Sequence, residues 1–327
     1  MDQGQRIRKK PTSKTTAHLF IKKKPKIAEM KRSRENLFHE CRFGIDSTSG
    51  IISKETVQCN LIVTSPPYFG CRDYTIGSKN ALGNSFSSSS SSSSVLIQLG
   101  HEKTPYEYVR RLCKTFENPQ QTLAIDGSLF VIIGDTFARS DFVDEIGEFQ
   151  NIYARETIGI HHLVVIEMRR LGYRMWQEIV WQKPSVPPSG AAQQRCNPCH
   201  EYVLWFVRRD CMPRPKFNAR SIREPGKTPA GKVMPPVGGR KYGEYKKTIV
   251  SDGMRCRQDV WNICPSRDKS AHVAPFPEEI VEICVLACTD EFDVVLDPFA
   301  GTLTTQRVCQ KLGRSSICYD MFDHQTL

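Results

Sequence analysis

Two short motifs near opposite ends of the chain each follow directly after an apolar run rich in β-branched residues. Thr-Ser-Pro-Pro-Tyr at 64–68 follows the run at 61–63, and Asp-Pro-Phe-Ala-Gly at 297–301 follows the run at 294–296. Short apolar runs of this kind predict buried strands. Open α/β sheets bind their ligands at the carboxyl ends of parallel strands. The two motifs therefore predict one site that is assembled from both ends of the chain.

The segments between the motifs alternate between strand patterns and helix patterns. Apolar residues at helical spacing, or a proline at an early helical position, predict helices, and short apolar runs predict strands. The expected helices are 104–116, 156–171, 277–288 and 303–312, and the expected strands are 57–64, 127–135, 173–181, 202–207, 293–296 and 315–319. This alternation favours an α/β fold with a mostly parallel sheet and helices on both faces.

Positive charge is concentrated in two segments. Residues 1–40 contain 12 Lys or Arg against 4 acids, and residues 207–260 contain 14 against 5, so the rest of the chain is net acidic although the whole carries +11. Such concentration predicts a polyanionic partner. Residues 1–40 lack apolar periodicity and are expected to form a disordered basic arm. The arm is either a solvated tail alone or a nuclear-targeting and phosphate-tethering segment.

Two further segments interrupt the alternation of strands and helices. Residues 208–255 contain six prolines and six glycines, are too long for a plain connector, and are expected to form a lobe. The serine-rich segment 85–94 predicts a mobile surface loop. No apolar stretch approaches the roughly 20 residues that are needed to cross a bilayer, so no membrane association is expected.

The 13 cysteines, in a chain whose N-terminus has no secretory signal, favour reduced thiols in the cytosol or nucleus. Cys196, Cys199 and His200 have the spacing of c-type haem attachment, and a zinc site that adds Cys256 and Cys264 is a second alternative. Haem attachment requires an exported protein, and one CxxC without a clear second pair is weak support for zinc. Structural thiols are the favoured interpretation.

The motif at 64–68 has the groups needed to orient an exocyclic amino nitrogen of a nucleobase. The lone pair of such a nitrogen is delocalised into the ring, so attack on a methyl sulfonium requires acceptors that draw its hydrogens into place. Ser65 and a backbone carbonyl supply two acceptors, while Pro66 and Pro67 fix φ and remove competing N–H donors. Tyr68 can stack on an extruded base, which contributes about 1–3 kcal/mol. A proline-stiffened turn with a packing tyrosine is the structural alternative.

The motif at 297–301 combines a strand end with a glycine turn and a following helix. Such a turn brings backbone N–H groups close to a ligand. Asp297 is expected to pair with the cationic α-amino group of a methionine-derived cofactor. Asp320 ends the next predicted strand, where an acidic side chain is expected to bond ribose hydroxyls, as in dinucleotide-binding folds.

In this order the motifs resemble those of β-class amino-methyltransferases of DNA, in which the catalytic motif precedes the cofactor motif. The resemblance covers roughly 55–320 and includes the segments 61–68, 126–135, 179–184, 200–201, 259–261, 274–277 and 295–301. It implies a Rossmann-like methyltransferase sheet with circularly permuted motif order, S-adenosyl-L-methionine as the methyl donor, and double-stranded DNA as the partner. It further implies a catalytic half at 41–207, an inserted target-recognition region at 208–258, and a cofactor-binding half at 259–327.

The resemblance also implies roles for individual residues. Ser65 and the Pro66 carbonyl engage the target amine, Pro67 and Tyr68 complete the catalytic motif, and Trp181 packs the flipped base. Cofactor contacts are expected from Asp297, Pro298, Phe299, Ala300, Gly301, Thr302, Asp320, Phe276 and Pro277. DNA contacts are expected from Arg220, Arg223, Lys227, Arg240, Lys241, Lys246 and Lys247.

Family members with Ser at the first position of the catalytic motif are mostly N4-cytosine methylases, whereas Asp is usual for N6-adenine. N4-cytosine methylation of DNA is therefore the leading hypothesis, with N6-adenine methylation, an RNA substrate and a DNA-binding relative without catalysis as alternatives. The last is motivated by Leu303, which stands where the family often has glycine and is expected to narrow the cofactor space. It is also motivated by the end of the chain seven residues after Asp320.

The basic arm and the serine run are typical of eukaryotic proteins. They lead us to expect a nuclear location, and chromatin association through regions outside this chain.

Overall fold

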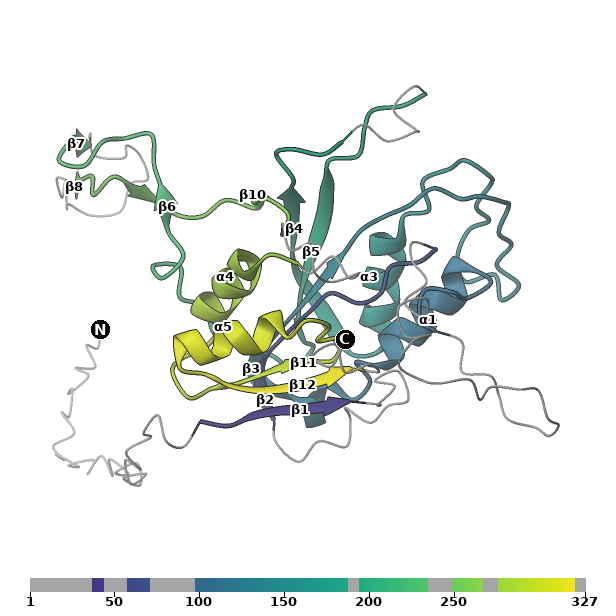
Figure 1. The fold of residues 1–327 in the computed structure, drawn as a ribbon, viewed down its shortest axis with the longest axis horizontal. Coiled ribbons are helices and arrows are strands. Elements are labelled where there is room, and N and C mark those ends of the chain that lie inside the picture. Colours follow the sequence, from purple (N-terminus) through teal and green to yellow (C-terminus); the bar gives the residue numbers. More distant parts are fainter. Residues whose placement is uncertain are drawn as a thin grey trace, which may run out of the picture. The chain divides into compact units, whose positions relative to one another are not determined.

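The computed structural model describes residues 37–43, 58–70, 98–187, 194–234, 249–266 and 276–320. Its main feature is an eight-stranded sheet with the order β1-β12-β11-β2-β3-β5-β4-β10 (Figure 1). The strands are β1 (His39–Phe43), β2 (Cys59–Thr64), β3 (Leu123–Ile133), β4 (Tyr173–Gln182), β5 (His200–Arg208), β10 (Val260–Asn262), β11 (Val294–Asp297) and β12 (Ser315–Asp320). Neighbours from β1 to β3 pair in parallel, β5 is antiparallel to β3 and β4, and β10 is parallel to β4. The predicted mostly parallel sheet is confirmed.

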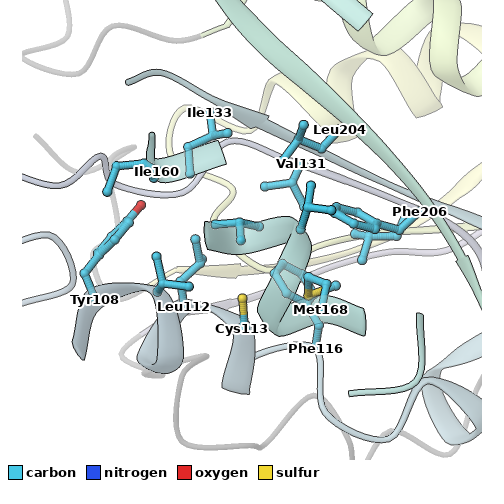
Figure 2. Packing of buried hydrophobic residues seen from close by; sticks show 14 of the residues in the cluster. Tyr108, Leu112, Cys113, Phe116, Val131, Ile133, Ile160, Met168, Leu204 and Phe206 are labelled. Carbon is cyan, nitrogen blue, oxygen red and sulfur yellow. The ribbon is translucent and has the colours of Figure 1, made fainter. Parts of the chain in front are cut away.

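Helices cover both faces of the sheet. They are α1 (Pro105–Lys114), α2 (Pro119–Thr122), α3 (Ile160–Arg170), α4 (Glu278–Cys288) and α5 (Thr304–Leu312). Leu61 and Val63 of β2 belong to a core cluster with α4 and α5, whereas Ile62 between them belongs to a second cluster with α1 and α3. This alternation is expected of a strand that is buried on both faces. Figure 2 shows the second cluster, where Leu112 of α1 and Met168 of α3 pack with residues of β3 and β5.

The predicted helix and strand boundaries agree with the structure to within a few residues at most ends. α1 begins after Thr104, whose side-chain oxygen accepts a hydrogen bond from the Glu107 N–H at 3.2 Å, and Pro105 follows at the first helical position. These are the residue types that helix N-termini favour. α3 begins at Ile160 rather than 156, because Gly159 before it has a φ of +77° and breaks the helical path.

The two outer strands, β1 and β10, were not predicted. β1 overlaps the end of the segment 1–40 that was expected to be a disordered arm, because His39 and Glu40 pair with Ser316 and Ile317 of β12. β10 is three residues long, and a single buried residue, Trp261, stands between two exposed ones. Elements this short give no periodicity to read.

The predicted lobe contains four short strands in two antiparallel pairs. β6 (Glu224–Pro225) pairs with β9 (Met254–Arg255), and β7 (Val233–Met234) pairs with β8 (Ile249–Val250). Frequent proline removes ladder donors and keeps such strands short. The serine run at 85–94, most of the basic arm and residues 235–248 lie outside the described residues.

Candidate active site

The order of the strands brings the two motifs together. β2 and β11 are adjacent and parallel, with Leu61 opposite Val295, so both motifs leave the same edge of the sheet. Their residues line one pocket of about 530 Å³ together with residues that follow β3 and β4. The lining includes Ser65, Pro66, Tyr68, Gly134, Asp135, Trp181, Lys183, His200, Glu201, Phe276, Phe299, Ala300, Gly301, Thr302 and Thr304. The predicted convergence of the two motifs is confirmed.

The catalytic loop at 64–68 is held by neighbouring elements. The Tyr108 hydroxyl of α1 donates a hydrogen bond to the Pro67 carbonyl oxygen at 2.8 Å. Gly100, with a φ of +98°, approaches so closely that a Cβ there would lie 2.7 Å from the Tyr68 carbonyl oxygen. Pro67 therefore anchors the loop and is not among the residues that line the pocket.

The Tyr68 ring is fixed from two sides. Its hydroxyl donates a hydrogen bond to Glu201 Oε2 at 2.8 Å, and the Lys183 ammonium donates to the other oxygen of the same carboxylate. Against the ring edge, a Cβ on Gly134 would lie only 2.8 Å from Tyr68 Cε2. Burial, with a further contribution from the Glu201 carboxylate, raises the pKa of Tyr68 well above its usual range, so the phenol remains a donor.

Glu201 and Lys183 were not predicted as site residues. Both lie within segments that carry the family resemblance, 200–201 and 179–184. Their roles need spatial information, because the partner that joins them, Tyr68, is more than 100 residues away along the chain.

Trp181 lines the pocket and is 4% exposed. Its indole N–H donates to the Ile263 carbonyl at 2.9 Å, and Lys183 Nζ lies 4.7 Å from its ring centroid, within cation–π range. In the antiparallel pairing of β4 and β5, Trp181 is directly opposite Glu201. The indole is therefore a fixed wall of the pocket.

Asp297 is a buried structural acid. The hydroxyls of Thr64 and Thr305 each donate to one of its carboxylate oxygens at 2.6 Å, and the residue is 0% exposed. Burial raises the pKa of Asp297 to about 6, against the opposing effect of these hydrogen bonds. The predicted contact between Asp297 and the cofactor stays a prediction. In the structure the carboxylate ties the end of β2 to the start of α5.

The turn after β11 presents backbone and small side chains to the pocket. Gly301 has a φ of +48°, and its N–H donates to Asp320 Oδ2 at 2.7 Å. Asp320 therefore holds the turn in shape. Of the predicted cofactor residues, Phe276, Phe299, Ala300, Gly301 and Thr302 line the pocket, whereas Pro277, Asp297, Pro298 and Asp320 are not among its lining residues.

Leu303 adopts a φ of +60°, in the left-handed region that glycine occupies freely. Its side chain is 3% exposed and packs with Ala300 and Cys318, and it does not belong to the pocket lining. The side chain therefore lies outside the pocket lining, and the expected effect of Leu303 on cofactor affinity stays a prediction. The replacement of glycine costs backbone strain of about 1–3 kcal/mol.

Asp135 joins the pocket to the start of α3. Its carboxylate accepts hydrogen bonds from the N–H groups of Thr136 at 2.9 Å, Gly159 at 3.0 Å and Ile160 at 3.1 Å. Asp135 therefore caps the N-terminus of α3, because Gly159 at the N-cap position has no side chain that could accept these hydrogen bonds. Asp135 was not predicted as a site residue, although an acid at the end of the predicted strand 127–135 was the available signal.

The predicted DNA-binding residues separate into three groups. Arg220 and Lys227 are exposed. Arg223 forms a two-point ion pair with Asp252, with Nη2 2.7 Å from Oδ1, and also donates to the Met254 carbonyl, so it is engaged in holding the lobe together. Arg240, Lys241, Lys246 and Lys247 lie outside the described residues.

The described cysteines are free thiols, and among the described residues Cys196, Cys199, Cys256 and Cys264 form no group with metal-ligand spacing. The described residues therefore give the zinc alternative no support. Within the same part of the chain, no helix is long and apolar enough to cross a membrane.

The family model described as DNA methylase, of the N6/N4 type, matches residues 59–325. Among curated relatives, the type II methyltransferase M.Cfr9I of Citrobacter freundii is 25% identical over 321 residues, which cover 94% of this chain and 90% of that protein. M.SmaI of Serratia marcescens is 26% identical over 280 residues, 81% of this chain and 80% of its own length.

Solved structures share the fold. The PvuII DNA methyltransferase (cytosine-N4-specific) has a TM-score of 0.57 at 17% identity, over 88% of this chain and 83% of that one. A DNA modification methylase of Thermus thermophilus, described as putative and solved in complex with S-adenosyl-L-methionine, has a TM-score of 0.50 at 20% identity, over 88% of this chain and 90% of its own. The α/β sheet is thus that of S-adenosylmethionine-dependent methyltransferases. With the family match over most of its length, the chain belongs to the N6/N4 DNA methylases, enzymes that methylate DNA with S-adenosylmethionine as the methyl donor.

Proposed function

We propose that this protein transfers a methyl group to the exocyclic N4 of a flipped cytosine within a specific sequence of double-stranded DNA. The observation that carries the proposal is the convergence of Ser65, Pro66 and Tyr68 with the turn at 299–302 in one pocket. Serine at the head of the catalytic motif favours cytosine over adenine. The name of one similar protein supports it further, because the PvuII methyltransferase is described as cytosine-N4-specific.

The pocket residues fit S-adenosylmethionine. The turn at 299–302 offers backbone groups and the Thr302 hydroxyl, and Phe276 and Phe299 offer apolar surface. The Lys183 ammonium forms an ion pair with Glu201. The carboxylate neutralises a positive charge that would otherwise repel the sulfonium of the cofactor. When bound, the cofactor supplies a methyl carbon attached to a positively charged sulfur.

Ser65 and Pro66 orient the target amine. The Ser65 hydroxyl and the Pro66 carbonyl oxygen accept the two N4 hydrogens, which turns the nitrogen lone pair out of conjugation and toward the methyl carbon. A bound cofactor would supply the methyl carbon and would leave as the neutral thioether with the electron pair of the broken C–S bond. The methylated nitrogen would then release one proton through the Ser65 hydroxyl to solvent, which restores a neutral amine.

Tyr68 and Trp181 hold the extruded base. Flipping a base from a duplex costs a few kcal/mol, and stacking on an aromatic side chain returns about 1–3 kcal/mol per base. Both rings are fixed by hydrogen bonds before any base arrives, Tyr68 to Glu201 and Trp181 to Ile263. Little ordering cost is therefore left for the binding step.

Positive charge outside the pocket supplies the sequence-independent attraction to phosphates. Arg220 and Lys227 are exposed in the lobe at 208–258, which we propose as the target-recognition region. The basic residues of 1–40 support a phosphate-tethering arm and a nuclear location.

Mass spectrometry of nucleosides from DNA incubated with the protein and S-adenosylmethionine tests the proposal, beside a Ser65→Ala control. We expect N4-methylcytosine that disappears in the control. N6-methyladenine would overturn the choice of base and retain the reaction class. The absence of any methylated nucleoside, with cofactor binding intact, would overturn the proposed activity.

A further inference from the structure

We infer that Glu201 is a positioning residue that fixes both aromatic walls of the pocket through its two carboxylate oxygens. The inference rests on the proposed function, because it concerns the rings that hold the flipped base. Glu201 Oε2 accepts the hydrogen bond of the Tyr68 hydroxyl at 2.8 Å. The other oxygen accepts from Lys183, whose ammonium lies 4.7 Å from the Trp181 ring centroid.

The sheet places Glu201 between the two rings. It stands opposite Trp181 in the pairing of β5 with β4, and its neighbour Tyr202 pairs with Ile133, the last residue of β3. Gly134 follows directly, and a Cβ there would lie 2.8 Å from Tyr68 Cε2 and 3.4 Å from Glu201 Cγ. Glu201, Gly134 and Tyr68 therefore meet in one packed contact at the strand ends.

The buried position of the pair makes the carboxylate difficult to replace. The side chains of Lys183 and Glu201 are only 19% and 16% exposed. An unpaired ammonium in this position is costly, and it would also repel the sulfonium of the cofactor. A glutamine at 201 would keep only one acceptor oxygen for Tyr68 and Lys183, and it would leave the Lys183 ammonium uncompensated.

A double-mutant cycle between Tyr68→Phe and Glu201→Gln tests the inference, read out as the single-turnover rate of DNA methylation. We expect each single variant to slow transfer on the order of tenfold, and the double variant to be no slower than the slower single one. Rates that fall multiplicatively would overturn the inference. Glu279→Gln, an exposed carboxylate of α4, is the matched control and should leave the rate unchanged.

Thermal unfolding and the Kd for S-adenosylmethionine, measured on every variant, separate positioning from folding. Retained melting temperature and cofactor affinity in Tyr68→Phe, with loss of rate, are expected. Gly134→Ala provides an independent steric test, because the added Cβ must displace the Tyr68 ring. A normal rate in a folded Gly134→Ala variant would overturn the inference. The methylated base is identified in the wild type, so a cycle without coupling refutes the role of Glu201 even where N4-methylcytosine is formed.

A second, independent observation points to a metal site beside the pocket: we propose that His161, His162 and Glu178 bind one divalent transition-metal ion. One ring nitrogen of each histidine of α3 and one carboxylate oxygen of Glu178 on β4 lie within 4.8 Å of one another. Imidazole and carboxylate ligands suit Zn²⁺, Co²⁺ and Ni²⁺.

The buried histidine supports a ligand in this position. His161 is 4% exposed, and its Nδ1 has no hydrogen-bond partner among the described residues. Asp135 Oδ2 lies 3.7 Å from that nitrogen, beyond hydrogen-bonding distance, so the hydrogen-bonding capacity of the nitrogen is unsatisfied among the described residues. His162 and Glu178 are exposed, so an ion can enter and both side chains can close toward His161.

Titration of the metal-stripped 327-residue chain with Co²⁺ tests this site by absorption spectroscopy. We expect one equivalent bound with nitrogen and oxygen ligation, and no thiolate-to-cobalt charge-transfer band. A His162→Ala, Glu178→Gln double variant should lose at least tenfold in affinity, whereas Glu279→Gln should bind as the wild type does. Unchanged binding in the double variant, or a thiolate band, would overturn the proposal. Retained S-adenosylmethionine binding shows that the double variant is folded.

Discussion

At the residue scale, the carboxylates at the ends of the central strands accept hydrogen bonds from other groups of the same chain. Asp297 accepts the hydroxyls of Thr64 and Thr305, and Asp320 accepts the Gly301 N–H. Asp135 accepts the N–H groups at the start of α3. Each carboxylate fixes a loop or helix start that borders the pocket. These acids therefore determine the positions of the backbone groups and hydroxyls that face the pocket.

Replacement of Asp297 by Asn is expected to remove a pH-dependent part of the stability. Burial raises the pKa of Asp297 to about 6, compared with about 3.9 for Asp in an unfolded chain. Because the folded state binds the proton more tightly, stability from this group is complete below about pH 4 and is lost as the pH rises to about 6. Two pKa units correspond to about 3 kcal/mol.

The free energy of unfolding of the wild type, measured with denaturant across this range, should therefore fall by up to about 3 kcal/mol more than that of Asp297→Asn. Parallel pH curves for the two proteins would show that Asp297 has an ordinary pKa.

Substitution of Leu303 by Gly sets two effects against each other. Release of the left-handed strain gains about 1–3 kcal/mol, whereas loss of a buried leucine side chain costs about 2–5 kcal/mol. The second effect is larger, so we expect a net loss of about 1–3 kcal/mol in the free energy of unfolding. Leu303→Ala loses the side chain and keeps the strain, so it should be less stable than Leu303→Gly. A glycine variant more stable than the wild type would mean that strain dominates. Cofactor affinity should be unchanged in both.

At the element scale, the sequence predicted the long elements and missed the short ones. The helices α1, α3, α4 and α5 and the central strands are fixed by local apolar patterns and by caps such as Thr104, so their existence can be read without tertiary information. β1 and β10 exist because they pair with β12 and β4, which only the folded sheet supplies. The same holds for the site. The motifs at the strand ends predicted where the pocket lies, whereas the roles of Glu201 and Lys183 depend on contacts between strands, which the sequence alone does not reveal.

Within the lobe, Arg223 and Lys227 form a matched pair for a test of DNA contact against structure. Arg223 is held by Asp252 and the Met254 carbonyl, so Arg223→Ala should lower the melting temperature slightly. Lys227 is exposed, so Lys227→Ala should leave the melting temperature unchanged. If Lys227 contacts a phosphate, its removal reduces the slope of log affinity against log salt by about 0.9. DNA titrations at several salt concentrations measure this slope. A lower melting temperature in Lys227→Ala, together with a reduced salt slope in Arg223→Ala, would contradict these roles.

At the scale of the whole molecule, the pocket and the basic N-terminal segment come from different parts of the chain. The pocket needs residues from 65 to 304, because its two motifs meet only in the folded sheet. Residues 1–33 contain 11 Lys or Arg against Asp2 and Glu29, and none of them belongs to the pocket lining. Phosphate attraction and chemistry should therefore be separable by truncation.

Removal of residues 1–33 is expected to weaken DNA binding without changing the chemistry. The cut precedes β1, whose pairing with β12 a longer deletion would disturb. Each phosphate contact that is lost removes about 0.9 from the salt slope, so loss of several contacts should reduce it by about 3 or more. The Kd for S-adenosylmethionine and the identity of the methylated base should be those of the full chain, because the pocket residues are all retained. An unchanged salt slope would show that the arm makes no phosphate contacts, and a lost cofactor affinity would show that it supports the fold.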